Sequence, residues 1–307
     1  MVNRGKVLVV DDEQDIQEIL TDVLDEEGYE AESVSDGKAA LEKLEFDDTF
    51  DLVISDIRMP RMDGFTLLSE IRRLYPSLKT ALITAYDVNT YIRMALEQDI
   101  GNVITKSSPF NFDEFLAIVD SIITGNIFGL ERRLSKETEI HTETLRSSAD
   151  IDSAVEKIAD FFEGFSNTAR IKTVLREIAV NAVYYGARDE DGAKKSEWDL
   201  DTVLKEDEYI DINYAYDSEK MAISVVDQKG RLKKKDVLYW LDRNITRTDT
   251  GMLQNLEDEH GRGLFISREF VDRFIINIER GKRSEVIMIN YTDDKYTGYK
   301  PLYINEI

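Results

Sequence analysis

Asp51-Leu52-Val53-Ile54-Ser55-Asp56 is a short apolar run that ends in a carboxylate and is followed by Ile57-Arg58-Met59-Pro60. Its length and its bounding acids predict a strand buried on both faces, as in a parallel sheet, with Asp56 at the carboxyl end. Open α/β sheets bind their ligands at that edge. Because a single acid there is commonly a helix cap or a solvated residue, a functional interpretation of Asp56 requires companion residues.

Three other short apolar runs also end in polar side chains. They are residues 7–10, followed by Asp11 and Asp12; residues 80–83, followed by Thr84; and residues 102–105, followed by Lys106. The carboxyl ends of parallel strands meet at one edge of the sheet, so these side chains should gather there. Clustered carboxylates repel one another unless a cation lies among them, and oxygen ligands suit Mg²⁺. We therefore predict a phosphoryl-transfer site with a carboxylate nucleophile, a metal ion and a neutralising ammonium.

With these residues in this order, residues 1–124 resemble a response-regulator receiver domain; Met59-Pro60 and Asp63-Gly64 also occupy family positions. The resemblance implies that Asp56 accepts a phosphoryl group from a sensor histidine kinase. It assigns Mg²⁺ to Asp11, Asp12 and Asp56, and catalytic roles to Asp56, Thr84 and Lys106.

Two departures from the receiver pattern are visible. The family's Lys-Pro pair is Lys106-Ser107 here, and the position three residues before the lysine, often aromatic in the family, is Val103. Phosphorylation chemistry should survive these changes, whereas the usual aromatic rotamer switch should be absent.

Composition limits the class of protein. A chain of 307 residues is long enough for about two domains. Its net charge of −23 disfavours a nucleic-acid partner. Without cysteine it has no disulfide and no cysteine metal site. No apolar run approaches the about twenty residues of a membrane span, and no targeting segment precedes residue 6, so we expect a cytoplasmic protein without a membrane partner.

The first 124 residues alternate between strand and helix patterns. A strand is expected at 29–34, and helices at 14–27, 37–46, 65–74, 87–97 and 112–123. This five-fold alternation predicts a doubly wound, five-stranded parallel α/β domain.

Residues 125–154 are predicted to form a helical linker. Apolar side chains at Ile127, Leu130 and Leu134, continuing to Phe162, fit a seam stepped by three and four residues. Two interpretations stay open: a coiled coil that makes a homodimer, or a connector packed on its own domain. Thr138 and His141 interrupt the seam, and we expect this break to let the linker switch between two arrangements when Asp56 is phosphorylated.

Residues 155–307 show a different order of elements. Their expected elements are a helix through 175–185, strands at 209–216 and 221–226, a helix at 233–242, a polar lid at 243–259, a helix from 260 to 271, and strands at 274–279 and 285–291. The first helix places Glu177 and Asn181 four residues apart on one face. The second strand ends at Asp227, and Gly261-Arg262-Gly263-Leu264 opens a helix whose free N–H groups suit phosphates.

This order resembles the ATP-binding domain of the GHKL class, which includes histidine kinases, and most closely its anti-sigma-factor serine-kinase branch. The resemblance implies a two-layer α+β domain that binds ATP, in which Asn181 holds Mg²⁺, Asp227 reads the adenine amino group and Glu177 serves as base. The remaining nucleotide-binding positions that it implies are Gly230, Gly261, Arg262 and Gly263.

The match to this class has departures. The family's Asp-x-Gly-x-Gly is Asp227-Gln228-Lys229-Gly230-Arg231, so both family glycine positions hold long basic side chains. These side chains either bring positive charge toward phosphates or narrow the pocket. Tyr185 replaces the histidine often found four residues after the asparagine.

We interpret the chain as a two-component response regulator whose Asp56 gates a GHKL-type output. By resemblance the output acts as a serine/threonine kinase on an anti-sigma antagonist, or sequesters a sigma factor. The alternative is a degenerate nucleotide fold that serves only as a phosphorylation-dependent docking module. A hybrid histidine kinase is disfavoured, because no phosphoacceptor-histidine motif precedes the ATPase-like region.

Overall fold

The structure, a computed structural model, describes residues 4–165, 168–187, 202–245, 262–293, 296 and 298–307. The chain forms two compact units, one of residues 1–127 with 296–302 and the other of residues 128–295 with 303–307.

The first unit contains the predicted parallel sheet, with strand order β2-β1-β3-β4-β5. The strands are β1 (Lys6–Val10), β2 (Glu30–Val34), β3 (Leu52–Asp56), β4 (Lys79–Thr84) and β5 (Asn102–Thr105). Every residue of β3 is buried, as its apolar run predicts. The doubly wound fold expected from the sequence is confirmed.

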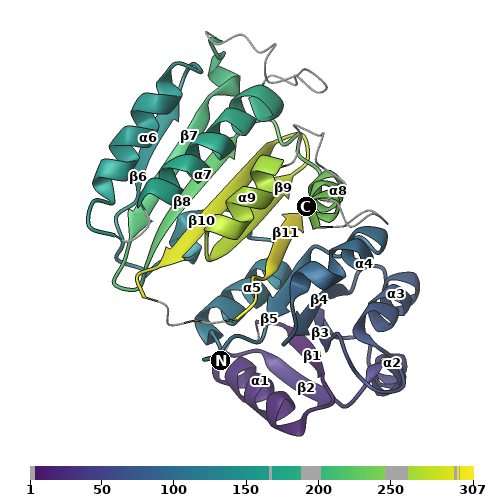
Figure 1. Cartoon of the computed structure of the whole chain (residues 1–307). Helices are drawn as coiled ribbons and strands as arrows, with labels where there is room; N and C mark the ends of the chain where they lie inside the picture. Colours follow the sequence, from purple (N-terminus) through teal and green to yellow (C-terminus); the bar gives the residue numbers. More distant parts are fainter. Residues whose placement is uncertain (1–3, 166–167, 188–201, 246–261, 294–295, 297) are drawn as a thin grey trace, which may run out of the picture. The chain divides into compact units, whose positions relative to one another are not determined.

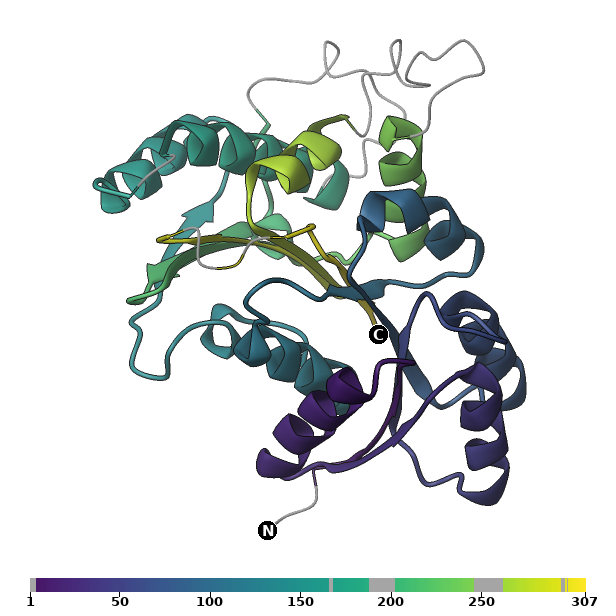
Figure 2. The same cartoon turned by 60° about the horizontal axis from the view of Figure 1, so that its bottom comes forward.

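The helices of this unit cover both faces of the sheet. They are α1 (Gln14–Glu26), α2 (Gly37–Phe46), α3 (Gly64–Leu74), the short η1 (Val88–Tyr91) with α4 (Ile92–Glu97), and α5 (Phe112–Thr124). α1 and α5 lie on one face, and α2, α3 and α4 on the other (Figures 1 and 2). Side-chain caps start four of them, at Asp36, Asp63, Asp87 and Asn111, because each accepts a hydrogen bond from a backbone N–H in the first turn.

The second unit has a mixed sheet with strand order β11-β9-β10-β8-β7-β6. The strands are β6 (His141–Leu145), β7 (Ile210–Tyr216), β8 (Lys220–Asp227), β9 (Arg273–Glu279), β10 (Arg283–Tyr291) and β11 (Leu302–Glu306). β11 runs parallel to β9, and the other pairs are antiparallel.

One face of this sheet carries helices (Figures 1 and 2). They are α6 (Asp150–Phe161), α7 (Thr168–Asn181) with its π-helical continuation η3 (Ala182–Ala187), α8 (Lys234–Ile245) and α9 (Arg262–Phe270). The short 3₁₀ segments η2 (Leu130–Arg132) and η5 (Glu206–Glu208) complete the described elements. The predicted two-layer α+β arrangement is confirmed.

The predicted linker helix is wrong. Residues 128–140 contain only the single turn η2, and they lead into the strand β6 and then into α6. Leu130 and Leu134 are buried in the second unit itself, and Gly129 has φ 98°, which no α-helix tolerates. The apolar spacing therefore reflects burial within one domain, so the coiled-coil homodimer loses its basis.

The predicted seam break is also wrong. His141 begins β6 and pairs with Tyr214 on β7; its ring centre lies 5.6 Å from that of Tyr214 and 4.9 Å from that of Phe161. Thr138 follows the turn at Ser135. These two residues therefore do not interrupt a helical seam, and the switch assigned to them has no structural counterpart.

Among the helices that the structure describes, none is both long and apolar enough to cross a membrane.

The position of Leu130 gives a test of this fold. Because Leu130 is 1% exposed, Leu130→Ala should lower the free energy of unfolding of the second unit by about 2–5 kcal/mol in urea denaturation. Val203→Ala is the matched control, since Val203 lies in the same unit and is 72% exposed. Unchanged stability of Leu130→Ala together with a lower sedimentation mass would instead support the coiled coil.

Candidate functional site

The first site lies where β1, β3 and β5 end. The Lys106 Nζ lies 2.8 Å from Asp11 Oδ2 and 2.8 Å from Asp56 Oδ1. Asp11 is fully buried and Asp56 nearly so. Two buried carboxylates thus share one ammonium group, which leaves a net negative charge in a site of oxygen donors. That charge and those donors fit a hard cation such as Mg²⁺.

The third predicted carboxylate lies outside this contact. Asp12 is exposed, and Glu13 is the other acid near Lys106, with Oε1 3.7 Å from Nζ. Among the residues that the structure describes, no three acidic or imidazole side chains converge closely enough to hold a metal ion. The ammonium of Lys106 lies between Asp11 and Asp56 and neutralises part of their charge.

Burial and the Lys106 ammonium shift the pKa of Asp56, the predicted nucleophile, in opposite directions. Burial raises the pKa of Asp56, and Lys106 and the Arg58 N–H, which donates to Asp56 Oδ2 at 2.6 Å, offset part of that rise. For Lys106 itself burial favours the neutral amine, but the two acids outweigh it and the pKa of Lys106 is raised. The lysine therefore stays charged beside a carboxylate that is costly to ionise.

Thr84 lies at the same sheet edge. It is fully buried at the end of β4, where it pairs with Thr105 of β5, and the Lys106 N–H donates to its carbonyl oxygen at 2.8 Å. Its Oγ1 accepts a hydrogen bond from the Tyr86 N–H at 3.1 Å. The structure therefore brings Asp11, Asp56, Thr84 and Lys106 to one edge, as predicted.

Sequence reasoning missed an aromatic pair beside this site. The Arg58 Nε donates to the Tyr91 hydroxyl at 2.8 Å, and the Arg58 guanidinium lies 4.0 Å from the centre of the Tyr86 ring. Val103 is buried in β5. The sequence signal for this pair is Tyr86, the aromatic residue two positions after Thr84. The aromatic position of the receiver pattern, 103, does not indicate it.

The second site lies on α7 of the other unit. The Asn181 Nδ2 donates to Glu177 Oε1 at 3.2 Å. A Cβ on Gly263 would fall 1.8 Å from that same oxygen, so the first turn of α9 lies directly against the Glu177 side chain. Glu177, Asn181 and Gly263 therefore form one cluster, in agreement with the sequence prediction.

Asp227, the last residue of β8, lies against the C-terminal end of the helical run formed by α7 and η3. Its Oδ1 accepts hydrogen bonds from the backbone N–H groups of Lys229 and Gly230, both at 2.9 Å, and burial raises the pKa of the carboxyl group. A Cβ on Gly186 would lie 3.1 Å from the Asp227 Cβ, so the helix passes against this residue. Glu177 and Asn181 lie on α7, and Gly186 lies on η3, which continues it. The predicted residues thus lie along one helical run and the strand end that it contacts.

The departures from the family pattern have partners within the domain. The Lys229 Nζ pairs with Asp207, and the Arg231 Nη1 donates to the Ala187 carbonyl at 2.8 Å. Gly230 has φ 58°, and a Cβ there would fall 2.2 Å from the Glu279 carbonyl oxygen. The Lys229 side chain thus points to an acid, and Arg231 lies beside the end of η3 that contacts Asp227. Gly230 allows the turn that follows β8.

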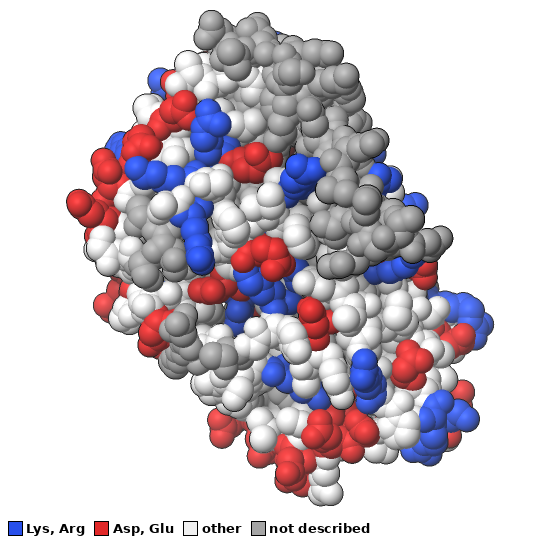
Figure 3. Space-filling model, viewed as in Figure 1, with Lys and Arg blue, Asp and Glu red and all other residues white. Residues whose placement is uncertain are grey.

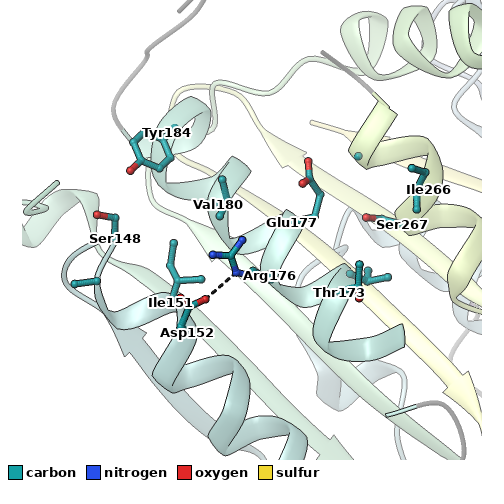
Figure 4. Close-up of a pocket in the computed structure, with 13 residues that line it drawn as sticks. Ser148, Ile151, Asp152, Thr173, Arg176, Glu177, Val180, Tyr184, Ile266 and Ser267 are labelled. Atoms are coloured by element: carbon teal, nitrogen blue, oxygen red, sulfur yellow. Dashed lines mark hydrogen bonds and ion pairs between the residues drawn. The ribbon is translucent and has the colours of Figure 1, made fainter. Parts of the chain in front are cut away.

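A cavity of about 660 Å³ opens beside Glu177, between α6, α7 and α9 (Figure 4). Glu177 lines it from α7, Tyr184 from η3 and Ser267 from α9. An ion pair between Arg176 and Asp152, 2.7 Å from Nε to Oδ1, joins α7 to α6 along its wall. Glu177 thus lines this cavity as well as the cluster with Asn181 and Gly263.

Several predicted positions lie outside the described residues. They are Gly261 and residues 246–259 of the expected lid. Arg262 is the first residue of α9.

On the face shown in Figure 3, the coloured Lys and Arg side chains are interspersed with acidic ones, and no continuous basic stripe covers the described residues.

Two family models match the chain. One described as a response regulator receiver domain matches residues 7–120, and one described as a histidine kinase-like ATPase domain matches residues 142–290. These matches agree with the two sites described above.

Individual relatives match a smaller part. The response regulator FleR of Pseudomonas aeruginosa is 38% identical over 127 residues, covering 41% of this chain and 26% of that protein. The DNA-binding transcriptional regulator NtrC of Escherichia coli K12 is 35% identical over 123 residues, covering 40% and 26%. The chain thus spans about a quarter of the length of these relatives. The solved structure of TrrA from Thermotoga maritima with Mg²⁺-BeF has 38% identity, covers 38% of this chain and 98% of that one, and has a TM-score of 0.35.

The raised pKa of Asp56 predicts a pH-dependent stability difference. A raised pKa means that the folded state favours the protonated carboxyl, so its stabilising contribution is present at low pH and is lost as pH rises through that pKa. Asp56→Asn should therefore have a higher free energy of unfolding in urea than wild type at pH 7–8, by on the order of 1 kcal/mol. This difference in stability should shrink as the pH falls toward 4.

Asp47→Asn is a control of opposite sign. Its pKa is lowered by the Lys6 ammonium, 2.8 Å away, so this variant should lose stability at neutral pH and recover as pH falls. Equal stability of wild type and Asp56→Asn at pH 8 would contradict the account of the first site.

Proposed function

We propose that this chain, which joins a response regulator receiver domain to a histidine kinase-like ATPase domain, is a regulator in which phosphorylation of Asp56 by a sensor histidine kinase gates an ATP-binding output. The contact between Lys106, Asp11 and Asp56 carries the input half of this proposal. The cluster of Glu177, Asn181 and Gly263 with Asp227 carries the output half.

The first site supports phosphoryl transfer to a carboxylate. An Asp56 oxygen forms the bond to phosphorus as the bond to the donor's imidazole nitrogen breaks, and the imidazole leaves with its electron pair. The Lys106 ammonium is already 2.8 Å from Asp56 and can neutralise a phosphoryl oxygen, while the Thr84 hydroxyl can donate to another. Mg²⁺, held by Asp11, Asp12 and Asp56, would neutralise the remaining oxygen charge.

The second site supports nucleotide binding. Asp227 Oδ1 takes two backbone N–H groups, and its Oδ2 faces Gly186, where it can accept a hydrogen bond from the adenine amino group. Asn181, which lies five residues before Gly186 at the junction of α7 and η3, would hold Mg²⁺ and orient the phosphates. The N–H groups at the start of α9, beside Gly263 and Arg262, suit phosphate oxygens.

The cavity beside Glu177 favours a serine/threonine-kinase-like activity. An acceptor hydroxyl that enters it would meet a carboxylate able to take its proton. By resemblance the acceptor is a Ser or Thr of an anti-sigma antagonist; the related option is sequestration of a sigma factor.

A second candidate is a non-catalytic docking module. Lys229 and Arg231 at the family's glycine positions favour it, because their side chains lie beside the Asp227 end of the site. Nucleotide binding separates the two candidates.

Nucleotide affinity should depend on Asp227. Asp227→Asn replaces an acceptor oxygen with an N–H group, so ATP·Mg²⁺ should bind about ten- to hundred-fold more weakly in calorimetry, a loss of about 1–3 kcal/mol. Asp236→Asn, an exposed acid on α8, should bind as wild type does. Equal affinities, or no binding by wild type, would favour the docking module.

Phosphorylation should depend on Asp56 and on a divalent ion. Asp56→Asn should abolish labelling by a small phosphodonor, and a chelator should suppress labelling of wild type. Lys106→Met should also reduce labelling strongly, because the ammonium that neutralises the phosphoryl oxygen is lost. Full labelling of Asp56→Asn would show that another residue is the phosphoacceptor.

A further inference from the structure

The segment 128–135, here called the strap, lies at the start of the second unit and is held there by specific contacts. The Phe128 ring centre lies 3.8 Å from the Arg283 guanidinium, and the Gly129 N–H donates to Glu285 Oε2 at 3.0 Å. The Ser135 N–H donates to Asp217 Oδ2 at 3.1 Å. Only residues 125–127 separate the end of α5 from the strap.

Glu285 makes the docking of the strap specific. It is 1% exposed on β10, and its Oε2 accepts hydrogen bonds from Gly129 and from the Asn277 Nδ2 at 3.0 Å. A buried carboxylate is stable only while its oxygens keep their donors. Release of the strap would remove the Gly129 donor from Glu285. The docked and released arrangements would therefore be two distinct states of different energy.

The residues that hold the strap also support the nucleotide site. On β10, Ser284 pairs with Asp227 of β8, and Glu285 pairs with Val226. The Arg283 backbone nitrogen would lie 2.7 Å from a Cβ on Gly230, so β10 packs directly on the turn that donates to Asp227. Residues 283–285 therefore contact the strap and the Asp227 turn at once.

We infer that the strap is the coupling element of this protein: docked, it holds residues 283–285 and thereby the Asp227–Gly230 turn in the geometry that binds nucleotide, and released, it loosens that turn. Its covalent continuity with α5 gives a change in the receiver one path to β10. The nucleotide part of this inference rests on the proposed function, whereas the mechanical part, from strap to turn, does not.

Hydrogen exchange of the full chain tests the mechanical part without nucleotide. Phe128→Ala removes the contact with Arg283, so exchange should rise at least several-fold both in the strap and at the amides of Lys229 and Gly230. Phe46→Ala, which removes a ring 90% exposed on α2, is the matched control and should leave both regions unchanged. Glu285→Gln, which keeps the shape of the side chain, is the second variant and should act in the same direction.

Two further measurements complete the experiment. ATP·Mg²⁺ titration should show several-fold weaker binding by Phe128→Ala than by Phe46→Ala. Treatment with beryllofluoride should change strap exchange in wild type and not in Asp56→Asn. If wild type binds no nucleotide while turn exchange still follows strap exchange, the coupling stands and the proposed ATP function fails.

Two outcomes would overturn the inference. In one, strap exchange rises in Phe128→Ala while the amides of Lys229 and Gly230 exchange as in wild type, so that the strap does not support the turn. In the other, neither region changes in Phe128→Ala or Glu285→Gln, so that these contacts do not hold the strap.

Discussion

A carboxylate buried at or near the end of a strand is stable only where a cation or a set of N–H groups meets it, and Asp56, Asp227 and Glu285 each have such partners. Asp56 has the Lys106 ammonium, Asp227 has two backbone N–H groups, and Glu285 has Asn277 and the Gly129 N–H. In each case burial raises the pKa, so each acid is sensitive to the loss or gain of a charged partner. The two candidate sites and the strap therefore depend on the same kind of interaction.

Much of the receiver unit could be predicted from sequence because its signals are local. Fully buried parallel strands appear as apolar runs such as 52–55, and the polar residue that follows each run must lie at the common edge. This reasoning located Asp56, Thr84 and Lys106. It does not reveal which of the adjacent acids Asp11 and Asp12 meets the lysine, because adjacent residues at a strand end point in different directions.

The region 125–145 was mispredicted because its determinants are not local. Leu130 and Leu134 have helical spacing, yet they are buried in a domain whose strand β7 follows more than sixty residues later. β6 is a strand because it pairs with β7, and β11 because it pairs with β9. For the ligand site, the order of Glu177, Asn181 and Asp227 was informative, whereas the close approaches at Gly186 and Gly263 and the partners of Lys229 and Arg231 required the structure.

The central claim is that the state of Asp56 controls the nucleotide site. Its most direct test is ATP·Mg²⁺ affinity of the full chain, measured by calorimetry with and without beryllofluoride, with Asp56→Asn as the reference. Domain switches of this kind supply coupling of about 1–3 kcal/mol, so the two states should differ in affinity by several-fold to roughly a hundred-fold, and Asp56→Asn should show no difference. Identical affinities, with beryllofluoride bound at Asp56, would contradict the account.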